Sequence, residues 1–354
     1  MSKDDFLKGV RGTAIVLVEA LFISAIVLLF VCPISCRFTS GAVDLITSDY
    51  ESPRLERFCV DSSRSMRFSF SRPVTMTDVS VYPLQTISSV EYEYASSESE
   101  SPSSSSSACF VNLKFSEPLS VGSDYTIFGC VKDVRGNSLS FCLPFSGFNE
   151  NPARLKIIEV HPKYQGESKG NCVFKNEYVL FKVEKAGNLS SLVLESAYAG
   201  GDKAYKFPSV FVKEGELVAV HLRSKGSGCI SELSEDLSLS KAYYSLPEVR
   251  DLWDENVEAR LGDDTDVLVL YEAQSKTMMD AFLYASTQAV SGGEWKKASM
   301  REYAVAAFEE GLWEAGPEIE AAFISDGITA TKSFIRRSDE NSPFGWEVGS
   351  STLR

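Results

Sequence analysis

The sequence of 354 residues has little histidine and a deficit of positive charge, and each shortage excludes a class of function. Its two histidines, His161 and His221, have no cysteine or carboxylate cluster at ligand spacing, which argues against a zinc site or a histidine-based catalytic centre. We expect both to be solvent-facing or hydrogen-bonded loop residues. With 35 Lys and Arg against 49 Asp and Glu, the net charge is -14, which repels phosphate backbones and excludes nucleic acid as an expected partner.

Motifs of common enzymes are missing as well. There is no Gly-x-Ser-x-Gly nucleophile elbow, and the glycine-containing stretches at 166–170 and 199–202 lack the Lys-Ser/Thr pair of a phosphate-binding loop. The densest acidic cluster contains Asp263, Asp264 and Asp266, whose spacing makes it a weak calcium candidate. Because no glutamate stands at the closing position of a calcium loop, a solvated turn is the better interpretation. The sequence therefore predicts no catalytic residue, no cofactor and no metal ion.

A hydrophobic run near the N-terminus predicts where the rest of the chain resides. Basic residues precede an apolar stretch at 20–31 that contains no charged residue, and the small residue Ser35 stands just before Cys36. This order is typical of an export signal, and its end resembles the lipobox of bacterial lipoproteins, which implies cleavage and lipidation at Cys36. An uncleaved anchor helix is an alternative, since about 20 apolar residues span a bilayer, and cleavage with release is another.

All three alternatives place the chain after this segment, 37–354, outside the cytoplasm. The expected location is extracytoplasmic and membrane-anchored, facing the periplasm or on the cell surface of a bacterium. The negative charge of the exported part disfavours docking on anionic lipid, so the N-terminal segment, 1–36, is the expected membrane contact.

Six cysteines follow this segment, an even number that is consistent with disulfides in an oxidising compartment. They are Cys59, Cys109, Cys130, Cys142, Cys172 and Cys229. Cys130 and Cys142 flank a turn sequence symmetrically about Gly136, so a hairpin there would place the two thiols opposite each other. Cys172 and Cys229 are the two cysteines of the later region and form the natural second pair. Buried free thiols remain the alternative for any of the six.

Short segments with period-two alternation follow a polar tether at 37–53. In the clearest of them, Met66, Phe68 and Phe70 alternate with polar residues, which is typical of a half-buried strand. A serine-rich loop at 96–107 interrupts the series and cannot bury a core. The pattern predicts a small antiparallel sandwich over 54–150.

Four motifs in this region resemble bacterial Ig-like domains of the S-layer-associated type. They are FSRPV at 70–74, FSEPL at 115–119, YT at 125–126 and VKDVRGN at 131–137. Such domains serve as spacers or binding modules and carry no catalytic residues, so the resemblance implies that role over 54–150.

The region 154–354 resembles the lamin tail domain in its bacterial, extracytoplasmic form. The resemblance rests on IIEV at 157–160, NEY at 176–178, DVLVL at 266–270, MDAFLY at 279–284, SFIR at 333–336 and the final WEVGSST at 346–352. It implies an Ig-like sandwich used for binding or scaffolding. Within it, Glu159 and Glu177 match positions of the pattern and are expected to serve structural roles at strand edges.

Two segments with helical spacing stand out from the second sandwich. The first has Val249, Leu252, Trp253, Val257 and Leu261 on one helical face. The second lies between Trp295 and Glu314 and ends at Gly316-Pro317. We expect both helices to cap open ends of the sandwich, with a partner-binding face as the alternative.

The predicted fold class is mainly β, with two Ig-like antiparallel β-sandwiches in tandem after an N-terminal apolar helix, and two short helical insertions in the second sandwich. The predicted function is that of a non-enzymatic, membrane-anchored envelope protein for adhesion, scaffolding or binding of a protein or envelope polymer. The alternative is an accessory or catalytic component of an extracellular metal-dependent hydrolase, because lamin-tail-like domains also accompany nucleases and phosphatases.

Overall fold

The computed structural model describes residues 51–94, 109–165, 170–171, 176–241 and 244–353. The predicted signal and Cys36, the serine-rich loop and Cys172 lie outside the described residues. Within them no helix is long and apolar enough to cross a membrane. The described chain is mainly β, with several antiparallel sheets and two short α-helices, as the sequence predicts.

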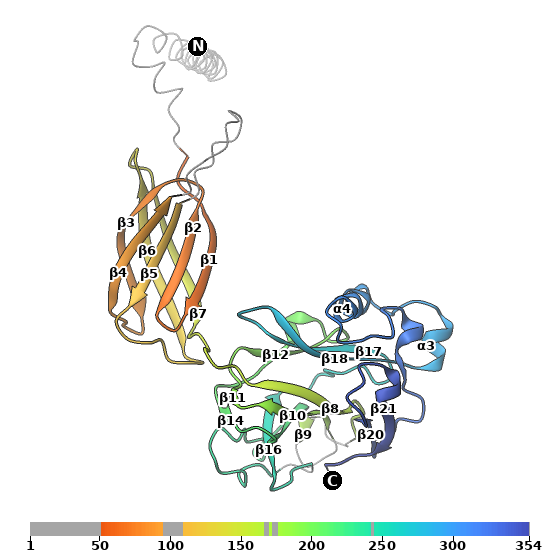
Figure 1. Ribbon diagram of the computed structural model, residues 1–354. Helices are drawn as coiled ribbons and strands as arrows, with labels where there is room; N and C mark the ends of the chain where they lie inside the picture. Colours follow the sequence, from red (N-terminus) through yellow and green to blue (C-terminus); the bar gives the residue numbers. More distant parts are fainter. Residues whose placement is uncertain (1–50, 95–108, 166–169, 172–175, 242–243, 354) are drawn as a thin grey trace, which may run out of the picture.

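The first sandwich packs a four-stranded sheet, in the order β1-β2-β5-β4, against a three-stranded sheet, β3-β6-β7 (Figure 1). Its strands are β1 (Leu55–Ser62), β2 (Ser65–Phe70), β3 (Val74–Tyr82), β4 (Ile87–Tyr94), β5 (Cys109–Phe115), β6 (Asp124–Asp133) and β7 (Ser138–Ser146). The predicted alternation holds on β2, where Met66, Phe68 and Phe70 are fully buried in the core. Ile127 on β6 closes that core from the opposite sheet.

The predicted hairpin joins β6 to β7, but its register differs from the expectation. Asp133 Oδ1 accepts hydrogen bonds of 2.9 Å from the backbone N–H groups of both Arg135 and Asn137, and Gly136 adopts a φ of 87°. These contacts pair Asp133 with Asn137 across the turn, so the hairpin is centred on Arg135 and not on Gly136.

This shift separates the two thiols that were expected to face each other. Cys130 lies opposite Ser140, and Cys142 lies opposite Phe128, so the cysteines are diagonal neighbours on the outer face of the sheet. Both thiols are free, and the predicted pairing of Cys130 with Cys142 is not formed. Diagonal neighbours across antiparallel strands stand farther apart than disulfide geometry allows.

The other predicted disulfide residues are distributed between the two sandwiches. Cys59 on β1 and Cys109 on β5 are separated by β2 and are free thiols. Cys229 is buried beside Trp253, and its predicted partner Cys172 lies outside the described residues, so that pair stays a prediction.

The second sandwich packs two larger sheets around the main core. One has the order β16-β15-β10-β8-β20-β21, with β9 beside β15, and the other has the order β13-β12-β17-β18-β19; β11 and β14 form a short separate pair. The strands of the first are β8 (Arg154–His161), β9 (Gly170–Asn171), β10 (Glu177–Lys185), β15 (Leu217–Lys225), β16 (Val249–Glu255), β20 (Lys332–Arg336) and β21 (Trp346–Ser350). The remaining strands are β11 (Gly187–Asn188), β12 (Leu192–Ser196), β13 (Tyr205–Lys206), β14 (Phe211–Val212), β17 (Asp266–Glu272), β18 (Thr277–Ala285) and β19 (Phe323–Ile324).

One of the two helical predictions is wrong. Val249, Leu252 and Trp253 lie on strand β16, which runs parallel to β15. Val249 to Trp253 are all buried, polar residues included, because both faces of this strand are covered. Burial on both faces removes the period-two alternation that marks a strand in the sequence, and the remaining apolar spacing imitates a helix.

The second helical prediction is confirmed. Helix α4 (Ala298–Glu309) buries Met300, Ala304 and Ala307, and it packs on β17 and β18 (Figure 1). It follows the short helix α3 (Thr287–Ser291), whose first turn is capped by Ser286.

The segment between the sandwiches is fixed by hydrogen bonds on both sides. Glu150 Oε1 accepts from Ser63 N at 3.1 Å and from Ser63 Oγ at 2.6 Å, which ties it to the first sandwich. Asn149 Nδ2 donates to Asn188 O at 3.0 Å and to Ser190 O at 2.6 Å in the second. The segment at 149–150 is therefore an ordered connection between the two sandwiches.

Candidate functional site

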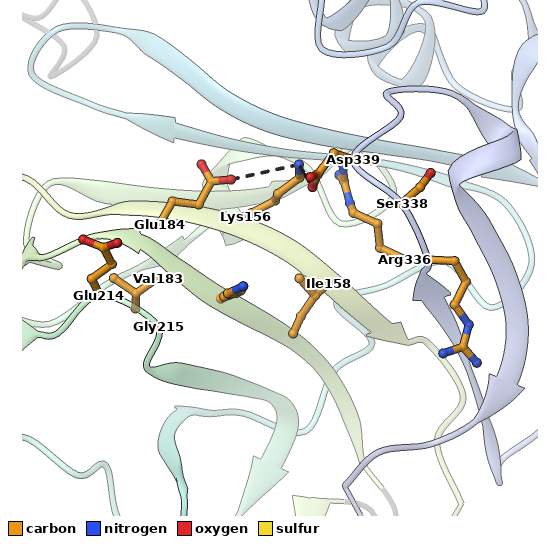
Figure 2. Close-up of a pocket in the computed structure, with 11 residues that line it drawn as sticks. Lys156, Ile158, Val183, Glu184, Glu214, Gly215, Arg336, Ser338 and Asp339 are labelled. Atoms are coloured by element: carbon orange, nitrogen blue, oxygen red, sulfur yellow. Dashed lines mark hydrogen bonds and ion pairs between the residues drawn. The ribbon is translucent and has the colours of Figure 1, made fainter.

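The outer face of the sheet that contains β8, β10 and β15 is divided into a covered half and an open half. Over the covered half, Tyr178, Leu180 and Ala219 pack with Tyr244 and Leu353. The open half is a groove of about 620 Å³ (Figure 2). Its lining residues are Lys156, Ile158, Lys182, Val183, Glu184, Glu214, Gly215, Arg336, Arg337, Ser338 and Asp339.

The floor of the groove is set by strand alternation and register. Leu155 and Ile157 point into the core of the sandwich, so Lys156 and Ile158 point to the opposite, outer face. Lys156 of β8 stands directly opposite Lys182 of β10 in the antiparallel pairing. Two lysines therefore lie side by side on neighbouring strands, an arrangement that repels itself unless carboxylates stand nearby.

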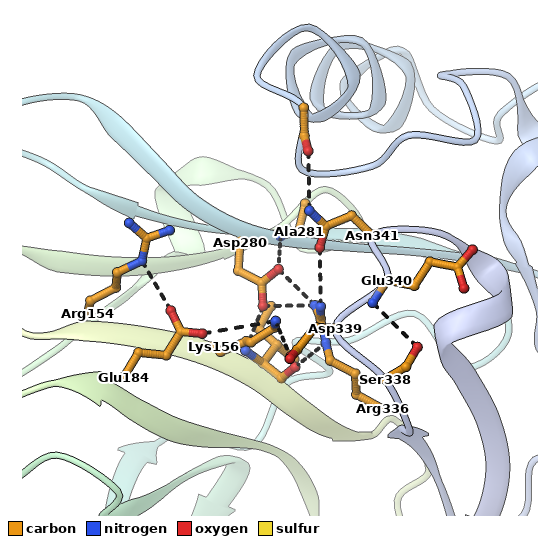
Figure 3. A network of polar contacts seen from close by, with 12 residues as sticks. Arg154, Lys156, Glu184, Asp280, Ala281, Arg336, Ser338, Asp339, Glu340 and Asn341 are labelled. Atoms are coloured by element: carbon orange, nitrogen blue, oxygen red, sulfur yellow. Dashed lines mark hydrogen bonds and ion pairs between the residues drawn. The ribbon is translucent and has the colours of Figure 1, made fainter.

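One of these lysines is neutralised by a network of carboxylates (Figure 3). Lys156 Nζ lies 2.7 Å from Asp339 Oδ1 and 4.0 Å from Glu184 Oε1, while Glu184 also accepts from Arg154 Nε at 3.1 Å. The hydrogen bond and positive charge of Lys156 lower the pKa of Asp339 below its ordinary value. Asp339 is therefore ionised at neutral pH, and its side chain remains 96% exposed.

The wall that carries Asp339 is fixed by a buried ion pair. Arg336 NH2 contacts Asp280 Oδ1 at 2.8 Å and Oδ2 at 2.9 Å, and its Nε donates to Ile157 O at 2.8 Å. The guanidinium also lies 4.8 Å from the Trp346 ring centre. Burial raises the pKa of Asp280, against the opposing charge of Arg336. This pair ties β20 to β18 and β8 and sets the position of the residues that follow Arg336.

The opposite wall is the turn that precedes β15. Gly215 adopts a φ of 82° and donates its N–H to Val183 O at 2.8 Å, while Val183 N donates to Glu216 O at 2.9 Å. These bonds hold Glu214 at the rim of the groove beside β10 (Figure 2). No hydrogen bond or ion pair engages the side chain of Glu214 or of Lys182 within the described part of the chain.

Sequence reasoning missed the pair that organises this site. Asp280 and Arg336 are 56 residues apart and carry no local periodicity that would join them. The signal was present in the lamin-tail resemblance, which includes Asp280 in its MDAFLY segment and Arg336 in SFIR without assigning either a role. Lys156 and Lys182 needed the strand register, which the sequence does not reveal.

The two histidines are buried in central strands, so the prediction of exposed loop positions is wrong. His221 on β15 is 1% exposed, contacts Asp251 Oδ1 at 2.7 Å through Nε2 and stacks on Trp253 at 4.0 Å. His161 on β8 is fully buried, with Nδ1 2.9 Å from Lys332 O. Both are hydrogen-bonded, as the alternative expectation states, but they lie in strands and not in loops.

The covered half of the sheet contains the residue types of a Ser-His-Asp relay in the wrong order. Ser245 Oγ donates to Asp251 Oδ2, the carboxylate that also binds His221. Among the described contacts no hydrogen bond joins this histidine to the Ser245 hydroxyl, so the three residues are not arranged as a nucleophile with its base. The hydrogen bonds of Asp251 to Ser245 and His221 attach the segment before β16 to the sheet.

The weak calcium candidate is not assembled. Asp266 is buried and accepts from Ser196 Oγ at 2.6 Å, from Tyr198 N at 2.8 Å and from Gly262 N at 3.0 Å. Asp264 instead pairs with Lys296 at 2.9 Å. Across the described residues, no group of three or more His, Cys, Asp or Glu side chains converges to hold a metal ion.

The two glutamates picked out by the lamin-tail pattern are buried, Glu177 at the first residue of β10 and Glu159 within β8. Glu177 accepts from Arg260 N at 2.8 Å, Leu261 N at 3.0 Å and Arg223 NH1 at 3.0 Å. Burial nevertheless raises its pKa to about 7. Glu159 accepts from Thr352 N at 3.0 Å and from the Tyr178 hydroxyl, which fixes the C-terminal residues to β8.

A family model matches the second sandwich, and a bacterial protein is related to the chain in sequence. The family model described as the TP_1001 protein second domain matches residues 153–348, more than half of the chain. An uncharacterized protein of Treponema pallidum (strain Nichols) is 29% identical over 233 residues, which cover 63% of this chain and 57% of that protein. The chain thus spans less than two thirds of that relative's length.

Two solved structures show only distant likeness. The N-terminal part of the bacterial S-layer protein SbsC has 14% identity and a TM-score of 0.22, over 69% of this chain and 45% of that one. A DUF4876 family protein from Bacteroides thetaiotaomicron has 9% identity and a TM-score of 0.30, over 77% and 92%. The lamin-tail and lipoprotein assignments stay predictions.

Proposed function

We propose, from the premise that the chain belongs to the TP_1001 protein second-domain family, that it is a non-enzymatic binding protein of a bacterial envelope. Its first sandwich acts as a spacer, and its second sandwich binds a protein or envelope polymer in the groove over Lys156 and Lys182. The observation that carries this proposal is the groove itself, an open sheet face with rigid walls and charged side chains.

The chemistry of the groove supports binding rather than turnover. Its lining contains lysines, arginines and carboxylates, with Ser338 as its hydroxyl and no histidine or cysteine. Glu184 is engaged by Arg154 and Asp339 by Lys156, and within the described residues neither carboxylate forms a hydrogen bond with Ser338 as a general base would. An open, hydrated surface also weakens the electrostatic stabilisation on which catalysis depends.

The sequence before the first sandwich supports the envelope location. The charged start, the apolar stretch at 20–31 and the Ser35-Cys36 pair have the order of an export signal with a lipid attachment site. The ordered connection through Asn149 and Glu150 supports a spacer that holds the binding module in a fixed direction.

The proposal is tested with the full chain purified in detergent and a panel of labelled peptides and envelope polymers. Saturable retention of at least one ligand, recovered with unchanged mass, is the expected result. Reproducible conversion of any panel member to a product, abolished by a chelator, would overturn it and favour the hydrolase alternative. Absence of saturable retention across the panel also counts against the proposal.

A further inference from the structure

We infer that the groove takes a mixed-charge peptide segment, with an acidic side chain of the ligand on Lys182 and a basic side chain on Glu214. This inference rests on the proposed binding function and specifies its ligand. The lining leaves two charges without a contacting partner among the described residues, and hydrogen bonds hold the turn that forms one wall.

Each positive group of the lining except one is already paired. Arg336 is held by Asp280, Arg337 by Glu347 and Lys156 by Asp339. Lys182 is exposed on β10, and its ammonium forms neither a hydrogen bond nor an ion pair with the described residues. Its charge contributes to the lowered pKa of Asp339, but it makes no direct contact with that carboxylate. An incoming anion therefore meets one cation that no carboxylate of the described residues contacts, and this cation lies on the floor of the groove.

The negative groups of the lining repeat this pattern with opposite sign. Glu184 is paired with Arg154 and approaches Lys156, and Asp339 is paired with Lys156. Glu214 alone among the lining carboxylates lacks a partner in the described structure. The Gly215–Val183 hydrogen bond fixes its backbone beside the strand that carries Lys182, and both side chains line the same groove.

This arrangement disfavours a ligand of one charge sign. A polyanion would gain Lys182 but would meet Glu184, Glu214 and Asp339 on the walls, and like charges brought together reduce affinity. A polycation would be opposed by the four basic residues of the lining. A peptide carries both signs on flexible side chains, and its apolar positions fit Ile158 on the floor, so a peptide with neighbouring acidic and basic residues satisfies the groove.

The test measures fluorescence anisotropy of the full chain in detergent with four labelled peptides of equal length: alternating Glu/Lys, all-Glu, all-Lys and Gly/Ser. The alternating peptide is expected to bind most tightly, with an affinity that falls as salt is added. Lys182→Glu and Glu214→Lys are each expected to weaken it about five-fold, the upper range for one exposed ion pair. Lys185→Glu, on the same strand but outside the groove, is the matched control and leaves affinity unchanged.

The outcomes separate this inference from the proposed function. Tighter binding of the all-Glu peptide, or equal affinity of the wild-type chain and both reversed variants for the alternating peptide, overturns the inference. Saturable binding of an envelope polymer without peptide binding also overturns it, although the proposed binding function then stands. Circular dichroism of both variants checks that the fold is intact, so a loss of affinity is assigned to the charges.

Discussion

The two sandwiches share an architecture but differ in what they bury. Among the described residues of the first sandwich, Asp133 is the only charged residue that is buried. In the second, many charged or titratable residues are buried: Glu159, His161, Glu177, His221, Glu232, Arg250, Asp251, Asp266, Glu272 and Asp280. The first core is therefore held mainly by apolar packing, whereas the second also depends on polar partners that must all be present.

The difference follows from how the sheets are covered. Each sheet of the first sandwich has one face on the core and one in solvent, so polar residues stay outside. In the second, the segment that contains Glu232 and Tyr244 covers half of the outer face as well. Glu232 accepts from Asp251 N at 2.8 Å and from Ser240 N at 3.1 Å, which replaces the water that those groups lose. The uncovered half is the groove.

The largest expected effect comes from breaking the buried pair that fixes the groove wall. Arg336→Ala leaves Asp280 buried without its partner, and removal of one member of a buried ion pair costs about 3 to 5 kcal/mol. All four tryptophans lie in the second sandwich, so their fluorescence in a urea titration reports its unfolding. The transition is expected at lower urea than in the wild-type chain.

The matched change in the first sandwich tests the contrast. Lys114 Nζ and Glu91 Oε1 form an exposed ion pair with a distance of 2.6 Å. Lys114→Ala is therefore expected to leave the urea concentration at which the first sandwich unfolds unchanged. Equal destabilisation by Lys114→Ala and Arg336→Ala would contradict the comparison.

The next effect is the response to pH, which has opposite sign in the two sandwiches. Burial raises the pKa of Glu177 to about 7 from its ordinary value of 4.5. The folded state then keeps a proton that the unfolded state releases, so the contribution of Glu177 to stability is fully present below pH 4.5 and falls by about 3 kcal/mol as the pH rises to 7. Urea titrations by tryptophan fluorescence at pH 4.5, 5.5 and 7 measure this slope, and Glu177→Gln is expected to reduce it.

Asp133 provides the opposite case in the first sandwich. Burial alone would raise its pKa, but hydrogen bonds from Asn137 and Arg135, with the charge of Arg72, lower it overall below 3.8. Its contribution to stability is therefore present above about pH 3.8 and is lost as the pH falls through the folded-state pKa. A first sandwich that gains stability as the pH falls below 3.8 would argue against this assignment.

A smaller effect is expected from the two turn glycines with left-handed backbone. A methyl group at Gly136 or Gly215 meets no atom within 4 Å, so substitution by alanine costs only the backbone strain, about 1 to 2 kcal/mol. Gly136→Ala should shift only the unfolding of the first sandwich, and Gly215→Ala only the tryptophan-detected transition. A shift of the tryptophan signal by Gly136→Ala would show that the sandwiches unfold as one unit.

The mildest probe is thiol labelling of the first sandwich with a maleimide, followed by mass mapping. Cys142 is exposed, and hydrogen bonds from Thr77 and Ser140 lower the pKa of Cys130, so these two are expected to react first. Burial raises the pKa of Cys59 and of Cys109, and Cys109 is expected to react only on unfolding. Protection of Cys130 and Cys142 until a reductant is added would contradict the free thiols and restore the predicted disulfide.

The sequence predicts strands well where one face is exposed to solvent and poorly where both faces are buried. Met66, Phe68 and Phe70 alternate with polar residues, and this alternation predicts strand β2. Val249 to Trp253 show no such alternation, since Arg250 and Asp251 are buried with partners that lie elsewhere in the chain. A local pattern does not contain the identity of these distant partners. The apolar spacing of β16 therefore predicts a helix where the structure has a strand.

The groove was beyond sequence reasoning for a related reason. Its floor requires the register that places Lys156 opposite Lys182, and its wall requires the contact between Arg336 and Asp280. Each joins residues that are distant in sequence. The acidic cluster at Asp263, Asp264 and Asp266 is adjacent in sequence, yet these side chains turn to separate partners.

Hydrogen exchange of the full chain, with and without the alternating Glu/Lys peptide, tests most directly whether the second sandwich is the binding module and the first a spacer. The account predicts slower exchange in both groove walls, at the 213–216 turn and at 337–339, with exchange in the first sandwich unchanged. Protection confined to the first sandwich, or bound peptide without slower exchange in either wall, would contradict it.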